Sequence, residues 1–476
     1  MNLESLQKKY PEFVYDSFDW KIKGGDLAVG FCFRMGGIEF NPKIIIYGVD
    51  EARVKKIGKA AMENLIFHLG MAEIPSYWKT ACAPKIIVNA GHLDKSQIKF
   101  WQNLFWRGMG QFFFENKLPF IVPEFKVNCQ KPKKHPFPMP GKFSSRVLAP
   151  MGGGKDSLVS WEILRQANKK AVMFALNPNE PLNEVCAAAR GDSAAVLRQI
   201  DPCLMAMNKK GFFNGHTPFS ALLSFHSIVV AALFDCRQVA ISQERSSNEG
   251  NVSYLGEEVN HQYSKSFDFE KKFRDYSKKY LAKNIDYFSI LRPLYELQIM
   301  AIFSGFVKYF PIFLSCNQSF TLSARADKKS GWCGECPKCL AGFAMLYPFA
   351  GEKNTIEIFG KNLFANKNLL PLMAQLLGEG DSKPFECVGT FTETRAAFYL
   401  SLAAAKKQNP DNLPILLQVF EKKFLPEYGN MATQSQKILS SWNKNHRLPK
   451  TLQNKLKSAL QSAILGRGLD KNQEVC

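Results

Sequence analysis

Short apolar runs alternate with amphipathic stretches along this chain, and the pattern changes near residue 145. Before that point, Ile44–Tyr47 and Lys85–Val88 are apolar runs of strand length, whereas the spacing of apolar residues over 51–69 predicts an amphipathic helix. Strands and helices are therefore mixed in this part of the chain. We expect residues 1–128 to form an N-terminal α+β domain.

From residue 145 onward, strand-like and helix-like patterns alternate regularly. Continuous apolar runs, which are typical of strands buried on both faces, occur at Arg146–Pro150, Ala171–Leu176 and Gln238–Ser242. Helical periodicity is found between and after them, at Leu158–Leu164, Leu182–Gln199 and Phe219–Phe234. This alternation predicts an α/β fold with a doubly wound parallel sheet, in which ligands bind at the carboxyl ends of the strands.

Three further segments complete the predicted organisation. Residues 129–144 contain four prolines and several lysines, which predicts an extended, solvated linker. Residues 145–350 are expected to form the catalytic domain. Residues 351–476 carry Leu-, Ala- and Lys-rich helical patterns without a chemical motif, so we expect a helical C-terminal region there.

Composition and charge restrict the classes of protein to which the chain can belong. Hydrophobic residues make up 46% and charged residues 22%, as in ordinary globular proteins. No apolar run reaches the roughly 18 residues that cross a bilayer, and the start of the chain lacks the features of a secretory signal, so we expect a cytoplasmic protein without a membrane partner. The net charge of +20 suits a nucleic acid or a polyanionic small substrate, and equally a basic proteome.

The most informative motif is a glycine turn between a predicted strand and a predicted helix. It consists of Gly152, Gly153, Gly154, Lys155, Asp156 and Ser157. Glycines let the backbone approach phosphate oxygens, and the unpaired N–H groups at a helix start favour an anion. A Walker A loop is excluded because Asp156 separates Lys155 from Ser157.

The glycine turn instead resembles the PP-loop, Ser-Gly-Gly-x-Asp-Ser, of the N-type ATP pyrophosphatases, which have the adenine nucleotide alpha hydrolase-like fold. Met151 stands where those enzymes usually have the first serine. The resemblance implies that the chain binds ATP and Mg²⁺ and cuts ATP between its α and β phosphates, so that a substrate is adenylated and pyrophosphate is released. A glycine-rich turn without this function is the alternative.

A cysteine cluster follows in the same predicted domain. Cys333, Cys336 and Cys339 form two successive C-x-x-C steps, and Cys316 is the natural fourth ligand. Thiolates at this spacing can reach one tetrahedral metal, so we expect a structural Zn²⁺, with a set of reduced thiols as the alternative. Together with Arg292–Leu294, the cluster resembles the C-terminal part of the cyano-deazaguanine synthases, which are PP-loop enzymes with a structural zinc.

Three polar stretches supply further candidates, since loops after strands carry the ligand-facing groups of open α/β folds. They lie at 214–218 ahead of a predicted helix, at 242–251 after a predicted strand, and at 260–266. Carboxylates and amides there can hold Mg²⁺, cations can hold phosphate or carboxylate, and imidazole can move protons. A solvated loop is the alternative for each of them.

Taken together, the motifs resemble one family of peptidoglycan-precursor enzymes, the UDP-N-acetyl-α-D-muramoyl-L-alanyl-L-glutamate epimerases. The resemblance rests on the glycine turn, the three polar stretches and the cysteine cluster, and it covers about residues 100–350, with Trp106–Phe113 as a weaker upstream part. It implies an isomerase that uses ATP to convert the terminal L-glutamate of UDP-MurNAc-L-Ala-L-Glu to D-glutamate through an acyl adenylate, releasing AMP and diphosphate. The UDP-linked muramoyl dipeptide is then the expected partner, and the oligomeric state stays open.

Within this resemblance, roles can be assigned to the polar residues. The expected catalytic residues are Asp156, Glu244, His261 and Lys265. The expected substrate-binding residues are Arg245, Asn248, Glu249 and His216. His261 and Lys265 are four residues apart, so they would share one face of a helix and could handle the α-proton. Glu244 or Glu249 would aid Mg²⁺, and Arg245 would hold an anionic group.

Two other functional classes stay open at this point. The first is a PP-loop enzyme of tRNA or nucleobase modification, by thiolation or deazaguanine nitrile synthesis, in which the cysteines could hold an iron–sulfur cluster. Nucleic acid would be the partner in the tRNA case, which the net charge of +20 would fit. The second is a nucleotide-binding module without enzymatic activity.

Overall fold

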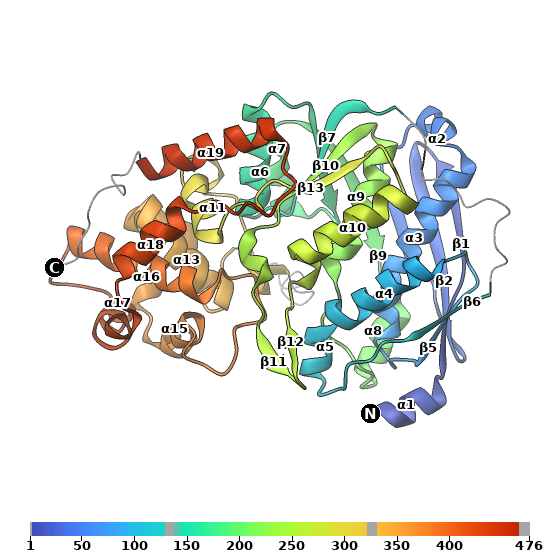
Figure 1. Ribbon diagram of the computed structural model, residues 1–476, viewed down its shortest axis with the longest axis horizontal. Helices are drawn as coiled ribbons and strands as arrows, with labels where there is room; N and C mark the ends of the chain where they lie inside the picture. The colour runs from blue at the N-terminus through green and yellow to red at the C-terminus, as the bar shows by residue number, and fades with distance from the viewer. Residues whose placement is uncertain (1, 129–138, 140–141, 321–330, 466–476) are drawn as a thin grey trace.

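The computed structural model describes residues 2–128, 139, 142–320 and 331–465 (Figure 1). Most of the predicted linker at 129–144 lies outside these residues. One large sheet lies at the centre of the described residues, and a group of helices forms one end of the molecule (Figure 1). The predicted α/β class is confirmed.

Five parallel strands form the part of the sheet that carries the candidate site. They are β7 (Ser144–Pro150), β8 (Ala171–Leu176), β9 (Asp192–Gln199), β10 (Cys236–Ile241) and β13 (Asp286–Ser289). Their order is β13-β10-β7-β8-β9, and each neighbouring pair is parallel. The chain thus moves outward from β7 to β9 and returns to add β10 and β13 on the other side. The order reverses between β7 and β10, which is where ligands bind in doubly wound folds.

Alternate side chains of these strands enter two separate cores. The helices that flank them are α3 (Lys59–Trp78), α6 (Lys155–Gln166), α9 (Phe219–Leu233) and α11 (Glu296–Phe303). Leu148 and Val172 pack in the core that contains α3 and α9, whereas Val147 and Met173 pack in the core that contains α6 and α11. Burial on both faces explains why these strands are continuous apolar runs in the sequence.

The N-terminal residues extend the same sheet. Their strands are β1 (Glu12–Lys23), β2 (Asp26–Met35), β3 (Ile38–Phe40), β4 (Lys43–Ile46), β5 (Lys85–Val88) and β6 (Glu124–Val127). β4 pairs antiparallel with β9, with Ile44 opposite Arg198, and the described residues form a sheet of 11 strands. The sheet therefore runs without a break from the expected domain at 1–128 into the one at 145–350. The helices of the N-terminal part, besides α3, are α1 (Leu3–Lys9), α2 (Glu51–Ile57), α4 (Lys95–Gly108) and α5 (Gly110–Glu115).

Two predicted helices differ from the structure. The helix expected over 51–69 is divided into α2 and α3, because Gly58 between them has a φ of +86°. The helix expected over 182–199 is wrong after α7 (Glu180–Ala189), where Arg190 turns the chain with a φ of +53° and β9 follows. In β9, Ala194 and Val196 are buried and their neighbours are more exposed, which is the period of a strand. Over so short a segment, the spacing of apolar residues in the sequence does not distinguish a strand from a helix.

The described residues after 350 form helices joined by loops, and they pack against the face of the sheet that carries α6 and α11. Their α-helices, with the one that precedes them, are α13 (Pro337–Ala350), α14 (Glu352–Phe359), α15 (Leu370–Leu377), α16 (Phe391–Gln408), α17 (Ile415–Val419), α18 (Met431–Ser440) and α19 (Lys450–Leu465). The segment between α15 and α16 contacts the loop that follows β10 and the first residue of α11. Among the described residues, no helix combines the length and the apolar character that a bilayer span requires.

Candidate active site

The glycine turn lies at the carboxyl end of β7, beside the reversal of strand order. Gly153 has a φ of +79°, which favours glycine, and Gly154 is the N-cap of α6. The Ser157 hydroxyl accepts a hydrogen bond from the Gly152 N–H (3.4 Å) and donates one to the Gly154 carbonyl (2.9 Å). The backbone N–H groups at the start of α6 therefore lie at the carboxyl end of β7, where they can bind an anion.

Lys155, the first residue of α6, is held by two carboxylates. Its Nζ lies 2.8 Å from Glu296 Oε1 and 2.9 Å from Asp156 Oδ1. The other oxygen of Glu296 accepts a hydrogen bond from the Gly389 N–H at 2.6 Å. Burial opposes a charge on Lys155, but Asp156 and Glu296 raise its pKa. Burial also raises the pKa of Glu296 to about 7, although Lys155 acts against the rise.

A buried arginine brings the polar stretches at 242–251 and 260–266 together. Arg292, which follows β13, donates to the carbonyl oxygens of Glu244 (2.7 Å) and Lys265 (2.6 Å). Glu270 of α10 (Phe267–Tyr280) balances its charge, with Oε2 lying 2.9 Å from Arg292 Nε, and both side chains are fully buried. The ion pair therefore fixes the backbone from which the Glu244 and Lys265 side chains project.

Glu270→Gln should destabilise the protein by about 3–5 kcal/mol, because it leaves the buried Arg292 charge without an anion. The midpoint of urea unfolding measures the effect. Asp286→Asn is the matched control, since Asp286 pairs with Lys278 where both side chains are 39% exposed, and the expected loss is under about 1 kcal/mol. Equal midpoints for Glu270→Gln and wild type would show that the ion pair does not hold these loops.

Two of the predicted site residues lie beside a cysteine, Cys387, and a third lies beside one of them. Lys265 Nζ lies 2.9 Å from Cys387 Sγ, and His261 Nε2 lies 3.9 Å from the same sulfur. His261 Nδ1 lies 3.0 Å from Asn251 Oδ1. The rings of His216 and His261 lie 6.3 Å apart, centre to centre. The structure thus brings His216, His261 and Lys265 into one cluster.

The prediction that His261 and Lys265 share one face of a helix is wrong. Residues Tyr263–Lys265 form a single 3-10 turn, and His261 precedes it, so the two side chains do not share the face of an α-helix. They come together because both approach Cys387.

Burial and neighbouring charges set the protonation states in this cluster. Burial, together with the charge of Lys265, lowers the pKa of His261 to about 3. Burial, together with His261, lowers the pKa of His216 to about 3 as well, so both imidazoles are neutral at pH 7. Burial opposes a charge on Lys265, but Cys387 and Glu244 raise its pKa, so Lys265 is an ammonium ion.

Asp156 and Glu244 connect this cluster to the glycine turn. The Asp156 side chain is 33% exposed, and its negative charge acts on the pKa values of Glu244, Lys265 and Cys387. Glu244 is buried, and burial raises its pKa while Lys265 acts against the rise. The charges of Asp156, Glu244 and Lys265 therefore act on one another, and those of Glu244 and Lys265 act on His261.

The remaining substrate-binding candidates have partners within the protein. The Arg245 guanidinium lies over the Tyr295 ring, 4.1 Å from its centre. The Asn248 side chain bonds to two backbone groups, the Arg245 carbonyl and the first N–H of α10. Glu249 lies 3.0 Å from Lys383 Nζ. Their roles in substrate binding stay predictions.

The four predicted cysteine ligands lie close enough to share one metal ion. The sulfur atoms of Cys316, Cys333, Cys336 and Cys339 all lie within 4.8 Å of one another. Thiolates bound tetrahedrally to zinc at about 2.3 Å would be about 3.8 Å apart, so the arrangement fits zinc. The N–H groups of Gly334 and Glu335 point to the Cys339 and Cys333 sulfurs, at 3.3 and 3.5 Å, which favours thiolates.

The cysteine cluster also holds two parts of the candidate site. The Leu314 N–H, two residues before Cys316, donates to the Gly153 carbonyl at 3.2 Å. The Lys338 N–H, within the cluster, donates to Glu386 Oε2 at 3.2 Å, next to Cys387. A metal bound by the four cysteines would therefore stabilise both the glycine turn and the loop that carries Cys387.

Cys336→Ser should lose bound zinc and unfold at a lower temperature than wild type, because metal binding by a closed four-ligand site is coupled to folding. Metal analysis of the purified protein and thermal unfolding check this, with Cys203→Ser as the control outside the cluster. Equal stability of Cys336→Ser and wild type, with no zinc in either, would contradict the prediction. Bound iron in wild type would favour the thiolation alternative instead.

Comparison with known proteins identifies the family. A model described as the MurL N-terminal domain matches residues 4–290, and a model described as the MurL C-terminal domain matches residues 312–430. This chain belongs to the MurL family. Three curated relatives, each 34% identical, are named UDP-N-acetyl-alpha-D-muramoyl-L-alanyl-L-glutamate epimerase. The predicted family and its isomerase class are thereby confirmed.

The curated relatives match most of the chain. The protein of Micromonospora sp. aligns over 336 residues, which are 70% of this chain and 73% of the relative. The protein of Salinispora tropica aligns over 327 residues, 68% of this chain and 70% of the relative. The protein of Xanthomonas oryzae pv. oryzae aligns over 335 residues, 70% of this chain and 73% of the relative.

Both MurL domains contribute to the candidate site. The MurL N-terminal match contains the glycine turn and the three polar stretches, and the MurL C-terminal match contains the four cysteines and Cys387. Glu296 lies between the two matches. The site is therefore assembled from parts of the chain that are far apart in sequence.

Two residues of the cluster are missed by sequence reasoning, Cys387 and Glu296. Cys387 stands apart from the cysteine motif in the sequence, and Glu296 begins an apolar helix. The one local sequence feature near Cys387 is the capping box of α16, in which Thr390 and Glu393 bond reciprocally. A capping box marks the start of a helix, so it indicates that a loop ends just before residue 391. That signal places a loop but gives no reason to link it to the glycine turn.

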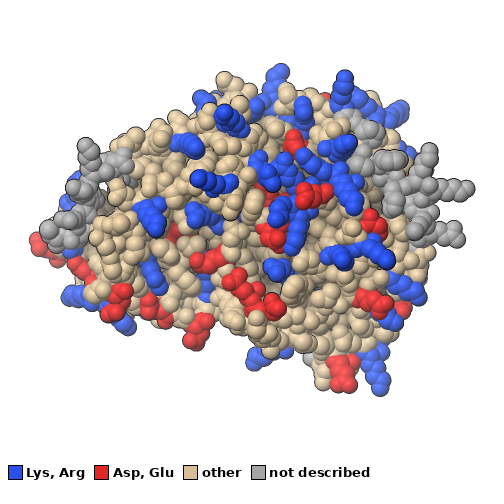
Figure 2. Space-filling model, viewed as in Figure 1, with Lys and Arg blue, Asp and Glu red and all other residues tan. Residues whose placement is uncertain are grey.

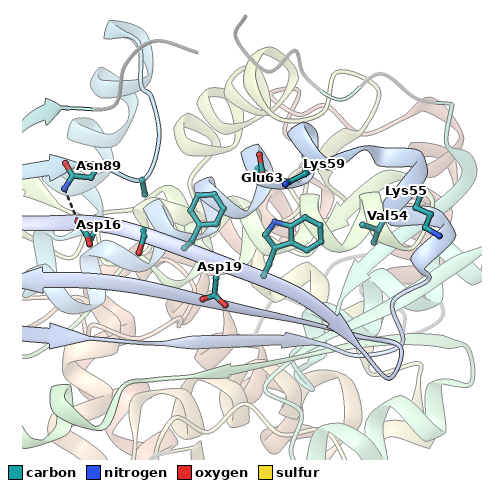
Figure 3. Close-up of a pocket in the computed structure, with 11 residues that line it drawn as sticks. Asp16, Asp19, Val54, Lys55, Lys59, Glu63 and Asn89 are labelled. Atoms are coloured by element: carbon teal, nitrogen blue, oxygen red, sulfur yellow. Dashed lines mark hydrogen bonds and ion pairs between the residues drawn. The ribbon is translucent and has the colours of Figure 1, made fainter. Parts of the chain in front are cut away.

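A small pocket lies beside two of the polar stretches. It has a volume of about 210 Å³ and is lined by Trp106, Arg107, Asn248, Asn260 and Tyr263, among others. Its walls thus combine the weaker upstream motif with two of the polar stretches. A wider groove of about 850 Å³ lies over β1, where Asp16, Asp19, Lys55, Lys59 and Glu63 line it, and none of the predicted site residues does (Figure 3).

The positive charge is concentrated in part on one visible face. Figure 2 shows Lys and Arg side chains gathered around α10, which carries Lys271, Lys272, Arg274, Lys278 and Lys279. Acidic partners compensate several of them: Lys272 lies 2.7 Å from Asp268, and Lys278 lies 2.9 Å from Asp286. The surface charge therefore does not by itself indicate a nucleic-acid partner.

Proposed function

We propose that this chain is an ATP-dependent epimerase that converts the terminal L-glutamate of UDP-MurNAc-L-Ala-L-Glu to D-glutamate in the synthesis of peptidoglycan precursors. The main support is the position of the glycine turn, because its Lys155 bonds to Glu296, and Glu296 bonds to the loop whose Cys387 contacts Lys265. The names of the curated relatives agree with this activity.

The chemistry of glutamate explains why a nucleotide site would adjoin a proton-transfer cluster. The α-hydrogen beside an ionised carboxylate is very weakly acidic, because its removal would place a second negative charge next to the first. Conversion of the carboxylate to an acyl adenylate removes that charge. A base can then take the α-proton, a proton returns on the opposite face, and water releases AMP from the adenylate.

The residues around the glycine turn suit the first step. Gly152–Ser157 would hold the phosphates through backbone N–H groups at the start of α6. Asp156 and Glu244 would share Mg²⁺, since the two carboxylates interact electrostatically. Glu249 suits this role less, because Lys383 Nζ lies 3.0 Å from it. Arg245 would hold an anionic group of the substrate.

The cluster around Lys265 suits the second step. Lys265 is an ammonium ion, so it can donate a proton or stabilise a developing negative charge. His261 is neutral, and its Nδ1 lies 3.0 Å from an amide oxygen, so Nε2 is the nitrogen that can accept a proton. His216 would line the same site beside His261.

The test is to incubate the protein with UDP-MurNAc-L-Ala-L-Glu, ATP and Mg²⁺, hydrolyse the product and determine the chirality of its glutamate. The proposal requires D-glutamate with ATP and none when ATP is replaced by a non-hydrolysable analogue. AMP and diphosphate should both form. Exclusive recovery of L-glutamate, from protein that binds ATP, would refute the proposed reaction.

A further inference from the structure

Cys387 is held in place by bonds on both sides of it in the sequence. Asn251 Nδ2 donates to the Pro384 carbonyl at 2.8 Å, and Glu386 Oε2 accepts the Lys338 N–H at 3.2 Å. Two residues after Cys387, the Gly389 N–H donates to Glu296 Oε2 at 2.6 Å. The loop is therefore fixed against the polar stretch at 242–251, the cysteine cluster and Glu296, which also holds Lys155.

The surroundings of the sulfur are polar and charged. Lys265 Nζ lies 2.9 Å and His261 Nε2 3.9 Å from Cys387 Sγ. An ammonium group is a strong donor, and a thiolate accepts its hydrogen bond far better than a neutral thiol does. His261 and Lys265 lie in one turn of the chain, and Cys387 reaches them from a loop 122 residues beyond Lys265.

The charges around Cys387 favour its ionised form. Burial opposes a thiolate, but Lys265 and Lys338 lower the pKa of Cys387 below its ordinary value, and Asp156 acts against this. Cysteines beside lysines are more reactive than ordinary thiols because the thiolate is the reactive form. Together with the 2.9 Å contact between Lys265 Nζ and Cys387 Sγ, these charges favour a thiolate that can accept a proton.

We propose that the Cys387 thiolate is the base that removes the α-proton on one face of the activated glutamate, with Lys265 as its counter-ion. This inference rests on the epimerase activity proposed above. The Cα–H bond breaks and the S–H bond forms, while the electron pair moves into the acyl group of the adenylate. A solvent-derived proton then adds to the opposite face, and the thiol loses its proton to solvent before the next turnover.

The neighbouring groups are less suited to be this base. Lys265 is already protonated, so it has no free electron pair with which to accept the α-proton. Burial and Lys265 lower the pKa of His261 to about 3, so its imidazole is a weak base. The thiolate is the group of the three that combines a free electron pair with a stabilising cation.

The test compares Cys387→Ser and Cys387→Ala with wild type and with Cys203→Ser, a cysteine outside the site. Formation of the adenylate is followed by ATP–diphosphate exchange, and inversion by the chirality of the product. Both Cys387 variants should keep exchange within about threefold and lose inversion by about 100- to 10,000-fold. Inversion at a near wild-type rate by either variant would overturn the inference, whereas wild type that makes no D-glutamate would instead refute the proposed function.

A second measurement does not depend on turnover. Cys387 should be alkylated by iodoacetamide at pH 7 faster than Cys203, and Lys265→Met should slow its alkylation several-fold, as peptide mass spectrometry can show. Saturation with UDP-MurNAc-L-Ala-L-Glu should protect it. An alkylation rate of Cys387 that is equal to that of Cys203 and indifferent to Lys265 would also overturn the inference.

Discussion

Asp156→Asn should reduce AMP release by at least about 100- to 1,000-fold while leaving the fold intact. Asp156 lies in the first turn of α6, next to the three glycines, and its charge acts on the pKa values of Glu244 and Lys265. Asparagine keeps the size of the side chain and removes the charge that would hold Mg²⁺ beside the ATP phosphates. Lys155 keeps Glu296 as a partner at 2.8 Å, so the helix start should stay in place.

Asp192→Asn is the matched control for this variant. Asp192 is the first residue of β9, so it lies at the amino ends of the parallel strands, away from the candidate site. Its side chain is 75% exposed and pairs with Arg146. AMP release and the unfolding midpoint should both be close to wild type for this control. Ser157→Ala, which removes the hydroxyl that bonds to Gly152 and Gly154, should also lose ATP turnover. Near-normal AMP release by both Asp156→Asn and Ser157→Ala would refute the PP-loop assignment.

Lys265→Met should slow epimerisation by about 100- to 10,000-fold while the adenylate still forms. Methionine has a similar length, but it removes the buried ammonium that pairs with Cys387 and acts on Glu244. Inversion and exchange of the α-hydrogen with solvent should fall together, because both need the proton-transfer cluster. ATP–diphosphate exchange with the substrate measures the adenylation step separately.

Lys272→Met is the control for the loss of a lysine near the site. Lys272 forms an ion pair with Asp268 on the surface of α10, where both side chains are about 40% exposed, and the variant should epimerise at the wild-type rate. If Lys265→Met and His261→Ala both epimerise as fast as wild type, the proton-transfer cluster is wrongly assigned even though the overall activity is right.

Features that depend on neighbouring residues could be predicted from the sequence. A strand, a glycine turn and a helix N-terminus are adjacent in the chain, so the setting of Gly152–Ser157 follows from local patterns. The two C-x-x-C steps likewise bring three sulfurs near one another, and Cys316 completes the set in the structure. Parallel strands that are apolar throughout indicate burial on both faces, which the two cores confirm.

Features that depend on distant residues could not be predicted in this way. The pairing of β4 with β9 joins segments about 150 residues apart, and no local pattern indicates it. Cys387 reaches Lys265 across 122 residues of sequence, and Glu296 reaches Lys155 across 141. The four-residue spacing of His261 and Lys265 predicts a shared helix face, whereas in the structure both side chains approach Cys387.

The most direct test of the epimerase proposal is the reaction in D₂O with UDP-MurNAc-L-Ala-L-Glu, ATP and Mg²⁺. Chirality, deuterium at the glutamate α-carbon and AMP are measured in the same sample. The proposal predicts D-glutamate that carries one solvent-derived deuterium at the α-carbon, formed only while ATP is converted to AMP. Inversion that proceeds without ATP, or AMP release with neither inversion nor deuterium in the glutamate, would contradict it.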